Sequence, residues 1–255
     1  MLVNSVPNAN GDPIGVEVGQ ATKPELPDTG KVLSGSLCRL EALSAESHAQ
    51  DLFGAFSLDA SDSLWTYLPQ GPFQSVDEFS SWVKQVQGQQ DPAFYAIIDE
   101  QTNRAVGVSA YLRIDQRASS IEIGWLTFSH LMQKKPIATE AMYLMMKNAF
   151  DLGYRRLEWK CNALNAPSIR AAARLGMSFE GVFRQATIVK GHSRDTAWFS
   201  ILDSEWPQVR SSMESWLAAD NFDEAGSQRL RLSDLTFPLL EDSWPQVTVK
   251  VSEQN

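Results

Sequence analysis

Apolar periodicity and helix-end signals together predict five helices. In most of these stretches apolar residues recur every three or four positions, which places them on one helical face. Ser75 begins a Ser-Val-Asp-Glu capping box, and Gly153 follows the longest stretch as a C-terminal stop. The predicted helices span about residues 45–56, 75–86, 136–152, 165–175 and 204–217.

Shorter apolar or alternating runs between these helices predict strands. The runs lie at about residues 37–43, 93–98, 105–114, 120–128, 156–161, 179–189 and 195–202. Short polar turns separate the strands between residues 93 and 128, which favours an antiparallel meander. The strands on either side of the long helix must be parallel if they are neighbours. The predicted fold class is therefore α/β (α+β), with a mainly antiparallel central sheet, one parallel crossover and flanking helices.

The two ends of the chain depart from this pattern. Residues 1–30 hold four prolines and few large apolar groups, so they bury little. Residues 218–255 begin polar and acidic and regain apolar character around 235–240 and 247–251. We predict a flexible N-terminal arm (1–33), one folded domain (34–217) and a C-terminal extension (218–255) that is partly docked or disordered.

Composition and charge exclude several classes of protein. The 255 residues are 43% hydrophobic, an ordinary globular mixture, and 22 Lys and Arg against 31 Asp and Glu give a net charge of −9. This balance argues against a general nucleic-acid binder and a polybasic membrane-surface protein. Without a signal peptide or an 18-residue apolar run, we expect a cytoplasmic protein with no membrane partner. Cys38 and Cys161 form no metal motif, so we expect no metal.

The segment from Gly124 to Met142 reads as a strand, a short loop and the start of the long helix. Lys134 and Lys135 stand where the helix begins with unpaired backbone N–H groups. Such a junction suits a phosphate, which the amides, the helix dipole and the lysines attract. A solvated basic turn that caps a core helix is an equally good interpretation of these residues alone.

In this segment and after it, the chain resembles the GNAT N-acetyltransferases. Gln133-x-x-Pro136-x-Ala138 is in the register of their Gln/Arg-x-x-Gly-x-Gly/Ala loop, which binds the acetyl-CoA pyrophosphate. The resemblance covers about residues 34–217, and its end is similar to the RimJ/RimL-like ribosomal-protein acetyltransferases. The further matching motifs are Gly124-Trp125, Asn165-x-x-Ser168, Leu175 to Gly181, and Asp195 to Trp206.

This resemblance implies transfer of the acetyl group of acetyl-CoA, as co-substrate, to a primary amine. The acceptor would be a small amine or a peptide N-terminus, attacked directly in a ternary complex, and the enzyme a monomer or homodimer. Pro136 replaces the first family glycine, and Ala172 stands where many relatives carry a tyrosine. The alternative is therefore a non-catalytic acyl-CoA-binding or regulatory protein with the same fold.

The resemblance also implies a cofactor site. The backbone of the strand before the loop would pair with the pantetheine arm, and the loop amides would hold the pyrophosphate. Asn165 would hydrogen-bond the cofactor arm, although Asn is also a favoured helix N-cap. The predicted cofactor residues are Leu126, Thr127, Phe128, Gln133, Lys134, Lys135, Ile137, Ala138, Thr139 and Asn165.

Glu122 and Ser168 are the predicted catalytic residues. Attack by a neutral amine requires a base, and Glu122 shares its side of a strand with Gly124, which leaves room for substrate. The alternative is a glutamate paired with an arginine such as Arg113. Ser168 would protonate the leaving thiolate in place of the missing tyrosine, or it is simply a serine on a helix surface. Trp65, Tyr67 and Phe73 would wall the acceptor site or pack beside it.

Overall fold

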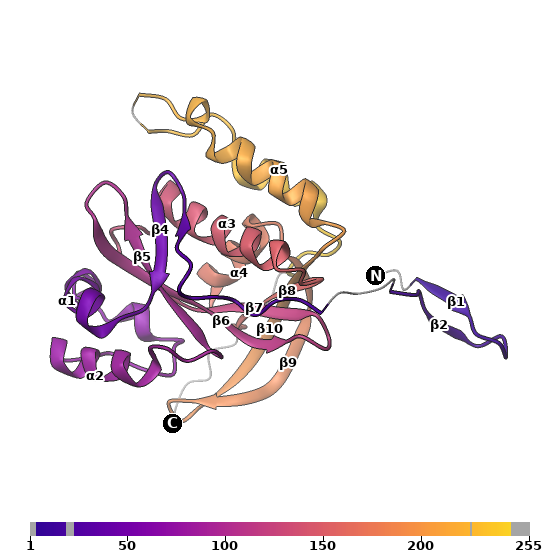
Figure 1. Ribbon diagram of the computed structural model, residues 1–255, viewed down its shortest axis with the longest axis horizontal. Coiled ribbons are helices and arrows are strands. Elements are labelled where there is room, and N and C mark those ends of the chain that lie inside the picture. The colour runs from indigo at the N-terminus through magenta and orange to yellow at the C-terminus, as the bar shows by residue number, and fades with distance from the viewer. Residues whose placement is uncertain (1–3, 19–22, 225, 246–255) are drawn as a thin grey trace, which may run out of the picture.

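The computed structural model describes residues 4–18, 23–224 and 226–245 (Figure 1). Its centre is a sheet with the strand order β3-β4-β5-β6-β7-β8-β10-β9. Neighbouring strands are antiparallel except β7 and β8, which are parallel. The strands are β3 (Leu33–Ser34), β4 (Cys38–Ala42), β5 (Ala93–Asp99), β6 (Arg104–Asp115), β7 (Ser120–Phe128), β8 (Arg156–Asn162), β9 (Ser178–Val189) and β10 (His192–Leu202). The predicted fold class is confirmed.

Helices cover the two faces of this sheet unequally (Figure 1). Helices α1 (Ala45–Phe56) and α2 (Val76–Val86) pack on one face, over β4, β5 and β6. On the opposite face lie α3 (Pro136–Asp151), α4 (Ala166–Arg174) and α5 (Trp206–Leu217). The part of the first face formed by β8, β10 and β9 lies beyond α1 and α2 and carries polar side chains. Glu122, its ion pairs and the pocket described below lie on this side of the sheet.

The helix ends follow local signals in the sequence. The Ser75 hydroxyl accepts a hydrogen bond from the Glu78 N–H at 3.2 Å, as a capping box requires. The Glu78 carboxylate reaches back one residue further than expected, to the Gln74 N–H at 2.8 Å. Pro136 is the first residue of α3, where a missing N–H costs no helical hydrogen bond.

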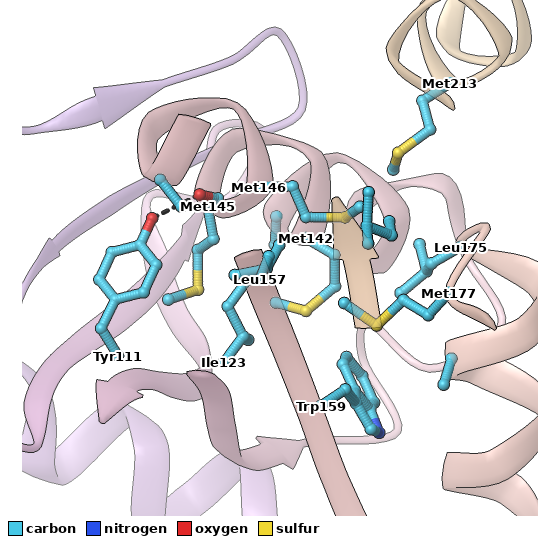
Figure 2. Packing of buried hydrophobic residues seen from close by; sticks show 14 of the residues in the cluster. Tyr111, Ile123, Met142, Met145, Met146, Leu157, Trp159, Leu175, Met177 and Met213 are labelled. Carbon is cyan, nitrogen blue, oxygen red and sulfur yellow. Dashed lines mark hydrogen bonds between the residues drawn. The ribbon is translucent and has the colours of Figure 1, made fainter. Parts of the chain in front are cut away.

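A methionine-rich core holds α3 against the sheet (Figure 2). Met142, Met145 and Met146 of α3 are buried over the central strands, beside Leu157 and Trp159 of β8. Flexible thioether side chains fill the irregular space between a helix and a twisted sheet. The Tyr111 hydroxyl donates to the Met145 carbonyl and so links α3 to β6. This packing fixes where the first turn of α3 lies relative to β7 and β8.

The N-terminal segment contains a hairpin that the sequence analysis did not predict. Strands β1 (Ser5–Pro7) and β2 (Pro13–Gly15) pair with each other, hold only exposed residues, and lie away from the main sheet (Figure 1). Further along, the Pro24 carbonyl accepts from Gln116, and the Glu25 N–H donates to the Leu152 carbonyl. The segment around residue 24 therefore contacts the body, and the boundary at residue 33 stays a prediction.

The C-terminal segment packs on the body as far as it is described. It contains η2 (Ala219–Asn221), α6 (Leu232–Thr236) and η3 (Phe237–Leu239). Leu232 is fully buried in the main core, and the Trp244 ring stacks on Phe199 at 6.1 Å. The predicted apolar stretch at 247–251 lies outside the described residues, and the boundary at 217 stays a prediction. Within the described ranges, the structure contains no helix of the length and apolarity that a membrane crossing requires.

Candidate active site

The parallel strands β7 and β8 separate in the middle of the sheet. They pair only at Ser120 with Arg156, Ile121 with Leu157 and Glu122 with Glu158. Beyond Glu122, β7 stays paired with β6 and β8 with β10. Trp125 has a φ of 54°, and the β6–β7 register shifts beside it, so β7 bends at this point. A gap therefore opens toward the C-terminal ends of both strands, where the loops leading to α3 and α4 begin.

The N-terminus of α3 lies at this open end of the sheet. Lys134 and Lys135 are exposed, and Lys135 is the N-cap of the helix. The Gln133 side chain donates to the Phe128 carbonyl at 2.7 Å, which ties the loop to the end of β7. Because Pro136 has no N–H, an anion here would depend on the other amides of the first turn and on the lysines.

A third cation, which the sequence analysis missed, lies at the same helix end. Arg174 of α4 donates to the Thr139 hydroxyl at 2.9 Å, and its guanidinium lies 4.8 Å from the Trp216 ring centroid. Burial lowers its pKa, and no carboxylate within the described ranges forms an ion pair with it. Thr139 and Ile137 are themselves buried, and Ala138 is half-buried. The first turn of α3 is thus electropositive on two sides.

Asn165 and Ser168 lie at the start of α4, beside the open end of β8. The Asn165 side-chain oxygen accepts from the Ser168 N–H at 3.2 Å, so the N-cap interpretation holds. Its amide nitrogen has no partner in the described parts of the chain and stays available for a ligand. The Ser168 hydroxyl accepts from the Trp159 indole at 3.0 Å. The same hydroxyl also lowers the pKa of the Cys161 thiol, so the role of Ser168 as a proton donor to the leaving thiolate stays a prediction.

Glu122 is 3% exposed, on the side of β7 opposite the methionine-rich core. Its carboxylate pairs with Arg113 at 2.7 Å and with Lys160 at 2.9 Å. The arginine partner considered as the alternative is therefore present, and the role of Glu122 as a base stays a prediction. A Cβ at Gly124 would lie 3.5 Å from the Glu122 carboxylate and 3.0 Å from Leu112, so glycine preserves space beside the acid.

The ion pairs continue from Glu122 across the uncovered part of the sheet. Lys160 pairs with Glu158 at 2.7 Å and lies 3.8 Å from the Trp198 ring centroid. Arg156 pairs with Glu158 and with Glu180. Burial opposes ionisation of Glu158, but the hydrogen bonds from Lys160 and Arg156 outweigh burial and lower its pKa. The face that α1 and α2 leave open is thus a network of alternating charges.

Neither cysteine is suited to act as a nucleophile. Burial raises the pKa of Cys161 to about 11, against the opposing effect of the Ser168 hydroxyl. Burial and the nearby Glu140 carboxylate raise the pKa of Cys38 far above its usual value. Because the thiolate is the reactive form, both thiols are inert near neutral pH. Among the described residues, no group of three or more His, Cys, Asp or Glu side chains is placed to hold a metal ion.

A pocket of about 570 Å³ opens on the same face, beyond the end of β8. The Tyr67 hydroxyl donates to the Leu164 carbonyl at 3.0 Å and closes one side of it. Lys190 donates to the Trp65 carbonyl at 2.8 Å and closes another. Phe73 packs on the Trp65 ring, behind the wall rather than in it. The lining residues are Asp62, Trp65, Thr66, Tyr67, Pro72, Asn162, Leu164, Val189, Lys190, His192, Ser193 and Arg194.

Comparisons with known proteins agree with this geometry. The family model "Acetyltransferase (GNAT) domain" matches residues 39–178, more than half of the chain. A GCN5-related N-acetyltransferase from Brucella melitensis is 42% identical, with a TM-score of 0.83, over 86% of this chain and 99% of that one. A probable GNAT acetyltransferase from Chromobacterium violaceum is 38% identical, with a TM-score of 0.71, over 80% of this chain and 100% of that one.

More distant relatives share the fold or part of the sequence. The uncharacterized N-acetyltransferase YnaD of Bacillus subtilis is 26% identical over 63% of this chain and 93% of its own. The microcin C7 self-immunity acetyltransferase MccE, solved with acetyl-CoA and AMP, is 21% identical over 66% of this chain and 93% of that one, with a TM-score of 0.58. RimL, a ribosomal L7/L12 α-N-protein acetyltransferase, is 21% identical over 68% of this chain and 94% of its own, with a TM-score of 0.57. These last two likenesses concern the fold alone.

Proposed function

The chain belongs to the GNAT acetyltransferase family, and from this premise we propose that it transfers the acetyl group of acetyl-CoA to a primary amine. The observation that carries the proposal is the separation of β7 from β8 beyond Glu122. The gap leaves strand backbone free to pair with an extended ligand, and it ends at a helix N-terminus with three nearby cations. An extended arm that ends in a diphosphate fits both features.

In this proposal acetyl-CoA lies along the gap. The backbone of Leu126, Thr127 and Phe128 pairs with the pantetheine arm, and the Asn165 amide donates to the arm from the opposite side. The pyrophosphate lies at the first turn of α3, near Lys134, Lys135, Ile137, Ala138 and Thr139, while Gln133 holds the loop in place. The fold neighbour MccE was solved with acetyl-CoA, which supports this choice of co-substrate.

The proposed reaction is direct attack in a ternary complex. Glu122 accepts a proton from the substrate ammonium, and the neutral nitrogen attacks the thioester carbonyl carbon. The C–N bond forms and the C–S bond breaks, and Ser168 supplies the proton that the leaving thiolate needs. The nitrogen loses two protons in all: Glu122 takes the first and passes it to solvent, and the second, lost once the C–N bond has formed, replaces the proton that Ser168 gives to the thiolate. The inert cysteines favour this route over an acetyl-enzyme intermediate.

The family resemblance suggests two classes of acceptor, a protein N-terminus and a small amine. A RimJ/RimL-like enzyme would acetylate a protein N-terminus, and the fold shared with RimL supports that choice. A small amine is the other acceptor class, and the pocket beyond β8, which has a volume typical of small-molecule sites, favours it. A cytoplasmic location, a monomeric or homodimeric state, and the absence of nucleic-acid and membrane partners stay predictions.

Calorimetry of acetyl-CoA binding tests the cofactor site. We expect the double variant Lys134→Ala/Lys135→Ala to bind acetyl-CoA about tenfold more weakly at low salt, with a smaller salt dependence, because exposed lysine–phosphate attraction is screened. The double variant Lys31→Ala/Lys84→Ala removes the same charge from exposed positions elsewhere and should bind normally. Equal affinity of the two double variants would remove the loop from the site.

Turnover separates the enzyme from its non-catalytic alternative. The unaltered protein is incubated with acetyl-CoA and a panel of polyamines, amino acids, aminoacyl nucleotides and peptides, and released CoA thiol is measured. We expect release that depends on the acceptor, with one acetyl group added to the amine by mass. Binding of acetyl-CoA with no transfer to any amine would instead favour a binding or regulatory protein.

A further inference from the structure

Arg194 on β10 is the one arginine of the uncovered sheet face that has no carboxylate partner within the described residues. Its Nε atom is buried and has no hydrogen-bond partner there. Burial has the largest effect on the pKa of Arg194 and lowers it. The Glu122 carboxylate is close enough to act against this effect but forms no ion pair with Arg194. Arg194 is half-buried, but its Nε–H is buried without an acceptor, which is costly unless a ligand supplies one.

Three other cations of the same face are each paired with a carboxylate. Arg113 has Glu122, Arg156 has Glu158 and Glu180, and Lys160 has both Glu122 and Glu158. The network is therefore complete without Arg194. No spare carboxylate in it is left to neutralise this arginine.

The surroundings of Arg194 are basic, in contrast to the net charge of the chain. Arg194 lines the pocket of about 570 Å³ together with Lys190 and His192, and Asp62 is the single acidic residue of the lining. The described partner of the Lys190 ammonium is the Trp65 carbonyl, which carries no net charge and so does not neutralise the lysine. The net charge of −9 would suit a cationic acceptor, but the local charge of this pocket suits an anionic group.

We propose that the amine acceptor of this enzyme also carries an anionic group, a carboxylate or a phosphate, which Arg194 binds in this pocket. The inference rests on the proposed function and specifies its substrate class. A planar guanidinium matches the two oxygens of either group, and Lys190 adds a second positive charge. The pocket has the volume of a small-molecule site, so the acceptor is a small amphoteric molecule rather than a simple amine.

Matched pairs of acceptors test this proposal. Methionine and methioninamide differ in a carboxylate, and phosphoethanolamine and ethanolamine differ in a phosphate. For the unaltered protein we expect kcat/KM to be roughly 10- to 100-fold higher for the anionic member of at least one pair. The pair that shows the preference identifies which anion is bound.

Variants of Arg194 then assign the preference to this residue. Arg194→Met should raise KM for the anionic acceptor roughly 10- to 100-fold, with a smaller change in kcat and unchanged acetyl-CoA affinity. Arg194→Lys keeps the charge and should recover part of the loss. The control Arg117→Met removes an exposed arginine outside the pocket and should behave as the unaltered protein.

A binding readout keeps this test separate from the proposed function. The same four acceptors are titrated by calorimetry into the protein saturated with CoA. Tighter binding of an anionic member that Arg194→Met abolishes would support the inference even if no acetyl transfer were detected. Equal binding and equal turnover of both members of each pair, or an unchanged preference in Arg194→Met, would overturn it while leaving amine acetylation intact.

Discussion

Two glutamates of this protein are almost equally buried, yet their partners differ in kind. Glu140 of α3 is 6% exposed and accepts three backbone N–H groups, from Ser36, Leu37 and Cys38, at 2.6–2.9 Å. Glu122 of β7 is 3% exposed and is held by the side chains of Arg113 and Lys160. One carboxylate is therefore fixed by main chain, and the other by side chains that can move.

This difference distinguishes Glu140, a structural acid, from Glu122, the acid that we propose as the base. Main-chain donors are placed by the fold and keep Glu140 where it joins the start of β4 to α3. Side-chain cations can shift as a substrate ammonium approaches, so Glu122 can exchange partners during a reaction. Gly35 lies beside Glu140 and Gly124 beside Glu122, and Gly124 belongs to the part of β7 that no longer pairs with β8.

Removal of the buried partner of Glu122 should have the largest effect on stability. The Lys160 side chain is 6% exposed and lies between two carboxylates, so Lys160→Met removes the positive charge that separates Glu122 from Glu158. We expect a loss of about 3–5 kcal/mol in the free energy of unfolding, measured with urea. Arg113 is 60% exposed, so Arg113→Met should cost less than about 1 kcal/mol. Equal losses for the two variants would contradict this ranking.

The structural acid should be the next most sensitive position. In Glu140→Gln the amide nitrogen would face a backbone N–H, and the remaining oxygen would lose its charge. We expect a loss of about 2–3 kcal/mol in the same measurement, because hydrogen bonds to a charged group are the stronger ones. The exposed control Glu17→Gln should change stability by less than about 0.5 kcal/mol. A Glu140→Gln variant as stable as this control would show that the three bonds contribute little.

A glycine substitution beside Glu140 probes the packing of this carboxylate with a smaller change, and a glycine in open space serves for comparison. A Cβ at Gly35 would lie 2.5 Å from the Glu140 carboxylate, so Gly35→Ala must displace it, at a cost of about 1–3 kcal/mol. Gly54 lies within α1 with open space around it, and Gly54→Ala should stabilise the protein by roughly 0.5–1 kcal/mol. Thermal unfolding of both variants gives the comparison, and a neutral Gly35→Ala would mean that Glu140 relaxes freely.

The elements of this fold could be read from the sequence where their signals are local. The caps at Ser75 and Asn165, Pro136 at the start of α3 and Gly153 after its end each act within a few residues, and the structure confirms the helices they bound. The hairpin of β1 and β2 was missed because its short, proline-containing strands bury nothing.

The site was harder to predict because its contacts join distant parts of the chain. Lys160 meets Glu122 only because β7 and β8 pair in one register, and Arg174 reaches Thr139 from another helix. The bend at Trp125 needs a positive φ that nothing about a tryptophan suggests. The motifs could therefore place the loop before α3, but not the charges that surround it.

Glu122→Gln, assayed for turnover across pH 6–9, tests the central claim that Glu122 is the base for amine acetylation. We expect turnover at neutral pH to fall roughly 10²–10⁴-fold while acetyl-CoA affinity stays near that of the unaltered protein. The loss should shrink as the pH rises, because more of the amine is already neutral. A variant with nearly normal turnover at neutral pH would contradict the claim, and one that loses stability and activity together, at every pH, would make Glu122 a structural ion-pair residue like its partners.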